Sequence, residues 1–217
     1  MDRILKRLLA GLVIAGMGVS GTAFGNLILN PSFEDGTGQG TGFDADPAPE
    51  IDDWTYWGED GWWTDEAAHD GTYSIKRWGT GLGMYQDFAA IAGVEYDFSL
   101  WAYDNSGEAM GAQSYLELRV EWWDGDPGDG GQQIGTGDSI GTFYGETATD
   151  TWTELSGSAM APTDTQVGRF LAVTEDDGEW SGAVLFDSAS AIPEPGTFAM
   201  LLLGGLGIAL LRHRRKL

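Results

Sequence analysis

The chain has 217 residues, a formal net charge of −23 at pH 7 and no cysteine. Such a charge argues against nucleic-acid binding, because phosphate contacts require clustered Lys and Arg side chains. The lack of cysteine excludes a disulfide framework and a thiolate metal site, and two histidines are too few for a His-rich zinc site. Apolar residues make up 42% and aromatic residues 12% of the chain, which is too much for a disordered protein.

The first 25 residues have the pattern of a secretory signal peptide. Arg3, Lys6 and Arg7 precede an apolar run over residues 8–19, and a small-x-small site follows at residues 23–25. These features are typical of a signal that the Sec export machinery accepts. We expect cleavage after Gly25. The alternative is a retained membrane anchor, for which the apolar run is short.

The C-terminal segment, residues 192–217, has three parts. Pro193, Glu194 and Pro195 interrupt the chain, residues 198–211 are apolar or glycine, and a basic cluster over residues 212–216 follows. A helix over the apolar part rises about 21 Å, short of a hydrocarbon core of about 30 Å, but snorkelling arginines and local bilayer thinning cover the difference. We therefore expect a C-terminal transmembrane helix in the inner membrane, with its basic end in the cytoplasm.

This tail resembles the PEP-CTERM sorting signal, which has the same three parts in the same order at the extreme C-terminus. The resemblance implies a Gram-negative export system in which an exosortase recognises the tail and cleaves near Pro193-Glu194-Pro195. It also implies a link to exopolysaccharide and the biofilm matrix. We expect a protein that is exported, anchored through its C-terminal helix before processing, and then located at the cell surface or outside the cell.

Residues 26–191 are expected to form one acidic domain, with 32 acidic and four basic side chains. Apolar and polar residues alternate in steps of two, most clearly over residues 96–103 and 115–123. The core-facing residues of these two strands are predicted to be Tyr96, Phe98, Leu100, Ala102, Leu116, Leu118, Val120 and Trp122. Further strands are expected at 27–29, 72–78, 83–88, 151–159, 167–173 and 183–190, and a hairpin turn between Trp123 and Ile134. This pattern predicts an all-β domain with two sheets.

Four pieces of sequence follow one another in this domain, at residues 26–36, 51–54, 69–99 and 184–187. Their order resembles the jelly-roll carbohydrate-binding modules of the galactose-binding-like class. The resemblance implies a jelly-roll β-sandwich and a structural Ca²⁺ held by Glu34 and Asp187, with backbone carbonyls near Asn26, Asp70 and Lys76 completing the shell. Ser188 stands where that family usually has a second acid. The alternative is that both carboxylates are merely solvated. Calcium or salt is expected to stabilise the domain, because its uncompensated acids repel each other.

The candidate ligand site consists of aromatic and charged residues that face away from the core. If strands 96–103 and 115–123 are neighbours, these residues form one strip: Trp101, Tyr103, Glu117, Arg119 and Trp123. The three aromatic side chains would stack on sugar rings, and Glu117 and Arg119 would bind hydroxyl groups. A second candidate is the loop cluster Trp54, Tyr56, Trp57, Trp62 and Trp63. The alternative for both groups is ordinary packing.

No enzyme is predicted. Among 32 acidic side chains, some pair of carboxylates will lie at the spacing of a glycosidase site by chance. Such a pair therefore does not indicate an enzyme. His69 precedes a turn, and the sequence has no phosphate-binding glycine loop. We expect an exported cell-surface or matrix protein whose β-sandwich binds polysaccharide non-covalently. The alternative is a structural biofilm-matrix protein with no specific glycan.

Overall fold

The computed structural model describes residues 25–145 and 149–194. The apolar run of the predicted signal peptide and the predicted transmembrane helix over 198–211 lie outside these residues. Within the described ranges, no helix is long and apolar enough to cross a membrane. Residues Asn26–Ile192 form one compact unit.

The described residues fold almost entirely into strands, which confirms the predicted all-β class. The two short 3₁₀ helices are η1 (Ser106–Glu108) and η2 (Pro127–Asp129). The strands are β1 (Gly36–Thr37), β2 (Glu50–Ile51), β3 (Thr55–Trp57), β4 (Gly61–Thr64), β5 (Ser74–Arg77), β6 (Leu82–Ala89), β7 (Glu95–Asp104), β8 (Ser114–Trp123), β9 (Asp138–Tyr144), β10 (Thr153–Met160), β11 (Val167–Asp176) and β12 (Val184–Pro193).

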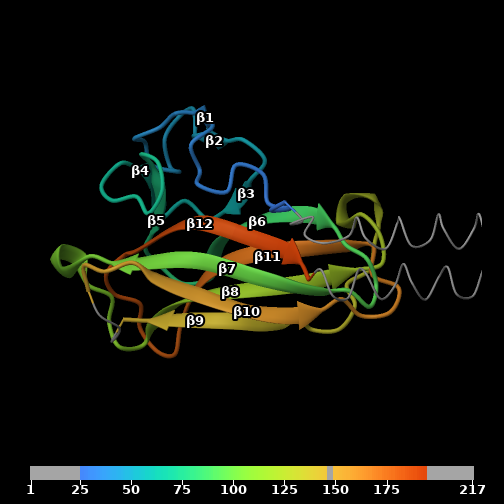
Figure 1. The fold of residues 1–217 in the computed structure, drawn as a ribbon. Coiled ribbons are helices and arrows are strands. Elements are labelled where there is room, and N and C mark those ends of the chain that lie inside the picture. The colour runs from blue at the N-terminus through green and yellow to red at the C-terminus, as the bar shows by residue number, and fades with distance from the viewer. Residues whose placement is uncertain (1–24, 146–148, 195–217) are drawn as a thin grey trace, which may run out of the picture. The chain divides into compact units, whose positions relative to one another are not determined.

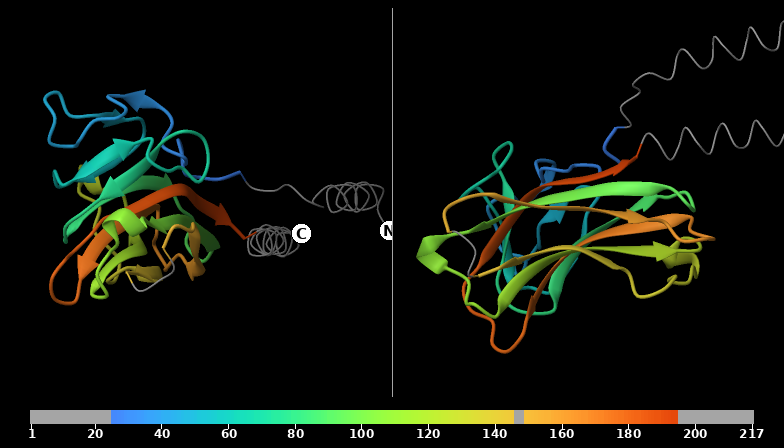
Figure 2. Two further views of the ribbon diagram at one scale, coloured as in Figure 1. Left: turned by 90° about the vertical axis from the view of Figure 1, so that its left-hand side faces the viewer. Right: turned by 60° about the horizontal axis from the view of Figure 1, so that its bottom comes forward.

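Ten of these strands form two five-stranded sheets, and β1 and β2 pair separately. Sheet I has the order β10-β7-β12-β5-β4, and sheet II has the order β3-β6-β11-β8-β9. The two sheets lie in separate layers (Figure 1), which two further views also show (Figure 2). The predicted two-sheet sandwich is therefore confirmed.

The core lies between the two sheets and is rich in aromatic rings. The residues predicted to face inward from β7 and β8 are all at most 2% exposed. The Phe98 ring of sheet I lies 6.1 Å from the Trp122 ring of sheet II, measured between centroids. Alternation located this core because it sends every second side chain to the same side of a strand.

The structure differs from the predicted strands at residues 27–29 and in five strands that were not predicted, the short strands β1 to β4 and the longer strand β9. Residues 27–29 form no strand, because Asn26 and Gln86 accept hydrogen bonds from the backbone N–H groups of Ile28 and Leu29 through their side chains. Strand β9 was not predicted, since its sequence is mostly small or polar and Phe143 is its one buried residue. The predicted hairpin turn joins β8 to β9, and Ile134 N donates to Trp122 O over 2.7 Å.

The last strand ends at the first residue of the predicted sorting motif. β12 extends to Pro193, three residues past the predicted end of this strand. The Asn26 side chain fixes the strand, because its Nδ2 donates to Ala189 O over 2.8 Å and its Oδ1 accepts from Ala191 N over 3.0 Å. Leu27 N donates to Ala191 O over 2.9 Å. The start of the domain and its final strand are thus joined directly before the motif.

Candidate functional site

The five residues predicted to form one strip lie on opposite sides of the sandwich. Trp101 and Tyr103 belong to β7 in sheet I, whereas Glu117, Arg119 and Trp123 belong to β8 in sheet II. The premise that these two strands are neighbours is therefore wrong. Both strands turn their predicted inner side toward the shared core, so their outer sides point in opposite directions.

The outer side of sheet II carries the denser group of aromatic and charged residues. Pairing across the strands places Arg169 of β11 beside Asp87 of β6, and Leu171 between Tyr85 and Arg119. We call this surface the sheet II face and define it by Trp57, Tyr85, Glu117, Arg119, Trp123 and Arg169. It unites three residues of the predicted strip with Trp57 from the second predicted cluster.

Arg169 is held between two aromatic rings on this face. Its guanidinium carbon lies 4.0 Å from the centroid of the Tyr85 ring and 5.2 Å from that of Trp123. Its Nε and Nη2 donate to the two carboxylate oxygens of Asp87 over 2.6 and 2.9 Å. These hydrogen bonds raise the pKa of Arg169. The Arg169 guanidinium is a rigid planar group that Asp87 holds with two hydrogen bonds. Because both rings stack on this group, it keeps them in place.

Trp57 extends the aromatic surface across β6. Its ring lies against Gly83, where an added Cβ would come within 2.5 Å of ring carbon Cη2. The glycine therefore leaves room for the indole, whose Nε1 donates to Gly81 O over 2.7 Å. The ring centroid of Trp57 lies 6.3 Å from that of Tyr85. Two aromatic side chains from different strands thus stand side by side.

A partly buried ion pair lies on the same face, on the other side of β11. Glu117 is 8% exposed and accepts a hydrogen bond from Arg119 Nη2. Neighbouring strands are about 4.8 Å apart, so a sheet of five strands is about 19 Å wide. The face therefore offers rings for C–H surfaces and paired charges for hydroxyl groups over a width that suits several sugar units.

Sequence reasoning missed Tyr85 and Arg169 as members of this site. A signal for Arg169 was present, because it is one of only four basic residues between positions 26 and 191. Two of these four, Arg119 and Arg169, lie on the sheet II face. Tyr85 stands between Met84 and Gln86, which are buried, so alternation could have indicated its outer side, but nothing local indicated which strands flank it.

Trp101 and Tyr103 belong to a separate cluster on sheet I. The exposed His69 ring stacks on Trp101 with centroids 3.9 Å apart and an interplanar angle of 14°. Trp152 contacts both His69 and Tyr103, at centroid distances of 5.7 and 5.2 Å. One face of the Trp101 ring is therefore covered by protein.

The second predicted cluster is dispersed by the fold. Trp54 and Trp63 are buried in the core, and the Tyr56 ring stacks on Phe43 at 4.3 Å between centroids. Trp57 lies on the sheet II face, and Trp62 is exposed on edge strand β4. These five residues therefore do not act as one site.

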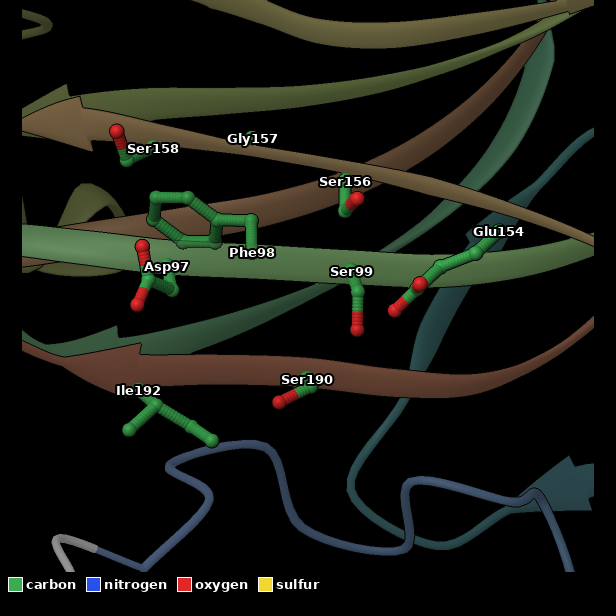
Figure 3. A pocket seen from close by; sticks show the side chains of 9 residues that line it. All are labelled: Asp97, Phe98, Ser99, Glu154, Ser156, Gly157, Ser158, Ser190 and Ile192. Atoms are coloured by element: carbon green, nitrogen blue, oxygen red, sulfur yellow. The ribbon is translucent and has the colours of Figure 1, made fainter.

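A hollow of about 430 Å³ on sheet I is lined mainly by hydroxyl and carboxylate groups. Figure 3 shows Ser99, Ser156 and Ser190 on adjacent strands, with Asp97 and Glu154 beside them. Its one aromatic residue, Phe98, belongs to the core and is 2% exposed. The hollow thus lacks an exposed ring on which a sugar could stack.

The predicted calcium ligands hold the same loop from two directions. Glu34 Oε1 accepts hydrogen bonds from the N–H groups of Thr72 and Tyr73 over 2.8 and 2.7 Å. Asp187 Oδ2 accepts from His69 N and Asp70 N over 2.7 and 3.0 Å. The two side chains fix the loop that connects β4 and β5.

The charge of these two carboxylates suits a cation, but their shell is incomplete. Burial, with a smaller contribution from the charge of Glu34, raises the pKa of Asp187 to about 7 against the opposing effect of three backbone N–H donors. Among residues 25–145 and 149–194, no group of three or more His, Cys, Asp or Glu side chains is arranged to hold a metal. Backbone carbonyls would have to supply most of the six to eight oxygens that Ca²⁺ takes. Calcium binding stays a prediction.

Comparison with known protein families supports the interpretation of the tail. The family model of the PEP-CTERM protein-sorting motif matches residues 191–216. No curated protein matches the chain in sequence.

Solved structures with a similar fold include carbohydrate-binding modules. One is the C-terminal family 22 carbohydrate-binding module of Clostridium thermocellum Xyn10B, with 19% identity, a TM-score of 0.50 and coverage of 78% of this chain and 98% of the other. Another is a family 16 carbohydrate-binding module, with 21% identity, a TM-score of 0.51 and coverage of 77% and 99%. An arabinose-bound α-L-arabinofuranosidase, MgGH51, has 15% identity and a TM-score of 0.53, and 80% of this chain matches 27% of that enzyme.

These likenesses show a shared fold, since all three sequence identities are low. The motif match covers the C-terminal segment, and the structural matches cover the sandwich. The chain therefore carries a PEP-CTERM protein-sorting motif that follows, in sequence, a β-sandwich with the fold of carbohydrate-binding modules.

Proposed function

We propose that this is an exported cell-surface or matrix protein whose sandwich binds polysaccharide on the sheet II face. The observation that carries the proposal is the Arg169 guanidinium fixed between the Tyr85 and Trp123 rings on an outer sheet surface. Rings held in this way lose little conformational entropy when a ligand stacks on them. Trp57 and the Glu117–Arg119 pair extend the same surface with a further ring and with hydrogen-bonding groups.

The charges on the face favour binding over catalysis. Asp87 is paired with Arg169, and Glu117 is paired with Arg119. These two carboxylates are already engaged by a guanidinium, whereas a glycosidase needs one carboxyl group that donates a proton and another that acts as a base or nucleophile. Paired charges also suit the hydroxyl groups of a neutral sugar, since each carboxylate oxygen can accept a second hydrogen bond and each guanidinium keeps N–H groups that the ion pair does not use.

The tail supports export and sorting. We propose that the Sec machinery exports the chain, that the helix over residues 198–211 anchors it in the inner membrane, and that an exosortase cleaves near Pro193-Glu194-Pro195. Because β12 reaches Pro193, the enzyme would act at the border of the folded domain. Replacing Glu194 with Ala should retain the unprocessed chain in the membrane fraction. Unchanged release would contradict this assignment.

Affinity electrophoresis against a panel of neutral polysaccharides tests the binding site. Tyr85→Ala and Trp57→Ala should each weaken retardation by about tenfold, which corresponds to about 1.4 kcal/mol. Trp152→Ala, which removes an aromatic ring from the other side of the sandwich, serves as the matched control. Thermal unfolding of each variant checks that it is folded.

Two outcomes would contradict the proposal. Binding that is lost in Trp101→Ala but kept in Tyr85→Ala would place the ligand on sheet I. A folded wild-type protein that no polysaccharide retards would favour the alternative, a structural matrix protein with no specific glycan.

A further inference from the structure

A second hollow, of about 820 Å³, lies at the edge of sheet I and, unlike the first, is lined by several aromatic residues. Three tryptophans line it: Trp62 on β4, Trp78 just after β5 and Trp180 before β12. Trp63 and Ile75 point into the core, so their neighbours Trp62 and Lys76 point outward from the sheet. The hollow is therefore on the side of the sandwich opposite to the sheet II face.

An ion-paired lysine forms the polar part of the hollow. The Lys76 side chain is 9% exposed, and its Nζ lies 2.6 Å from Glu66 Oε2 and 2.7 Å from Glu108 Oε2. Burial alone lowers the pKa of Lys76, but hydrogen bonds to the two carboxylates outweigh it, and the pKa is raised. The ammonium group therefore stays charged, and the three side chains together carry one net negative charge.

The wall of the hollow is held in place by backbone contacts. Ala183 N donates to Glu108 O over 2.8 Å, which joins η1 to the segment before β12. Gly182 has a φ of +77°, and an added Cβ there would lie 2.1 Å from Ala109 O. Trp180 Nε1 donates to Gly182 O over 2.9 Å, which fixes its indole. The hollow is thus formed before any ligand arrives.

We propose that this hollow is a second carbohydrate-binding subsite, which takes a neutral sugar unit. Trp62 offers a ring that is 46% exposed, and Trp78 and Trp180 supply half-buried rings beside it. The oxygens of Glu66 and Glu108 accept hydrogen bonds from sugar hydroxyls, and Lys76 keeps both carboxylates in place. The net negative charge of this group disfavours uronic acids, since their carboxylates would be repelled.

Two sites on opposite sides would make one domain bivalent. This consequence rests on the proposed function, because it requires a ligand on the sheet II face as well. A bivalent domain joins two polysaccharide chains, and the second contact gains from a high effective concentration. Cross-linking of matrix polysaccharide is the activity that follows.

The test measures binding of cellohexaose and xylohexaose by titration calorimetry, with a hexamer of galacturonic acid as the charge control. Tyr85→Ala with Trp57→Ala disables the sheet II face, and Trp62→Ala with Trp78→Ala disables the hollow. Trp152→Ala is the matched control for the loss of an indole. In the protein whose sheet II face is disabled, we expect binding of a neutral hexamer that falls at least about tenfold when Trp62 and Trp78 are also replaced.

The outcomes separate this inference from the proposed function. If binding depends on Trp62 and Trp78 but not on Tyr85, the inference holds and the proposed sheet II site is wrong. If no neutral hexamer binds after the sheet II face is disabled, while all variants unfold cooperatively on heating, the second subsite does not exist. Preference for the galacturonic acid hexamer at the hollow would also overturn the inference.

Discussion

The buried carboxyl group of Asp187 predicts a pH dependence of stability that calcium should remove. Burial raises the pKa of this group to about 7, whereas its ordinary value is 3.8. In the absence of metal, the native state keeps the proton over a range in which the unfolded chain has released it. The free energy of unfolding therefore falls as the pH rises from about 4 to about 7.

The size of this effect follows from the two pKa values. Between about pH 5 and about pH 7.5, the group should lower the free energy of unfolding by about 2.5 kcal/mol, since one pKa unit corresponds to about 1.4 kcal/mol. General repulsion among the acids acts in the same direction, because lower pH neutralises part of it. The Asp187→Asn variant separates the two effects, since an amide does not titrate and the loss of one acceptor oxygen changes its stability equally at both pH values.

Urea denaturation followed by tryptophan fluorescence, in buffer with EDTA, measures the dependence for both proteins. The wild type should lose about 2.5 kcal/mol more than Asp187→Asn between the two pH values. Equal losses would mean that Asp187 is ionised in the native state, and the reasoning would be wrong. Added Ca²⁺ should favour the ionised group and raise the melting temperature of the wild type near neutral pH. A melting temperature that calcium leaves unchanged would contradict the predicted metal site.

Three further predictions concern stability, each measured by urea denaturation. Arg169→Lys should lower the free energy of unfolding by about 1–2 kcal/mol and weaken glycan binding, because lysine lacks the fork that pairs with Asp87 and stacks on the rings. Asn26→Ala should cost about 2 kcal/mol, since two hydrogen bonds to the final strand and one to Ile28 N lose their partner. Gly71→Ala should cost about 2 kcal/mol, because φ is +76° and the new Cβ would lie 2.5 Å from the Glu34 carboxylate.

Gly93→Ala is the matched control for Gly71→Ala. Gly93 has a φ of +77° and open space where a Cβ would stand, so Gly93→Ala isolates the backbone cost of about 1 kcal/mol. Equal losses at Gly71 and Gly93 would show that the contact with Glu34 adds nothing. If Arg169→Lys unfolds like the wild type, the stacked fork is not a stabilising element.

Local patterns of the sequence indicated much of this architecture. The two-residue alternation placed Leu118 and Phe98 in the core, because the side of a strand is fixed by neighbouring positions alone. The aspartate- and glycine-rich run after Trp123 indicated a turn for the same local reason. The order of charges and apolar residues at the C-terminus was also sufficient to indicate the sorting motif.

Composition and spacing by themselves determined the all-β class, the acidic domain, the inward-facing residues and the character of the tail. Only the tertiary structure decided that Trp101 and Arg119 face opposite sides, and that Tyr85 and Arg169 join Arg119 on one surface. The physical reason is that pairing is non-local: β11 lies between β6 and β8, although these strands are far apart in sequence. Alternation fixes the side of a strand that faces outward, but the choice of partner strands depends on how the whole chain packs around its core.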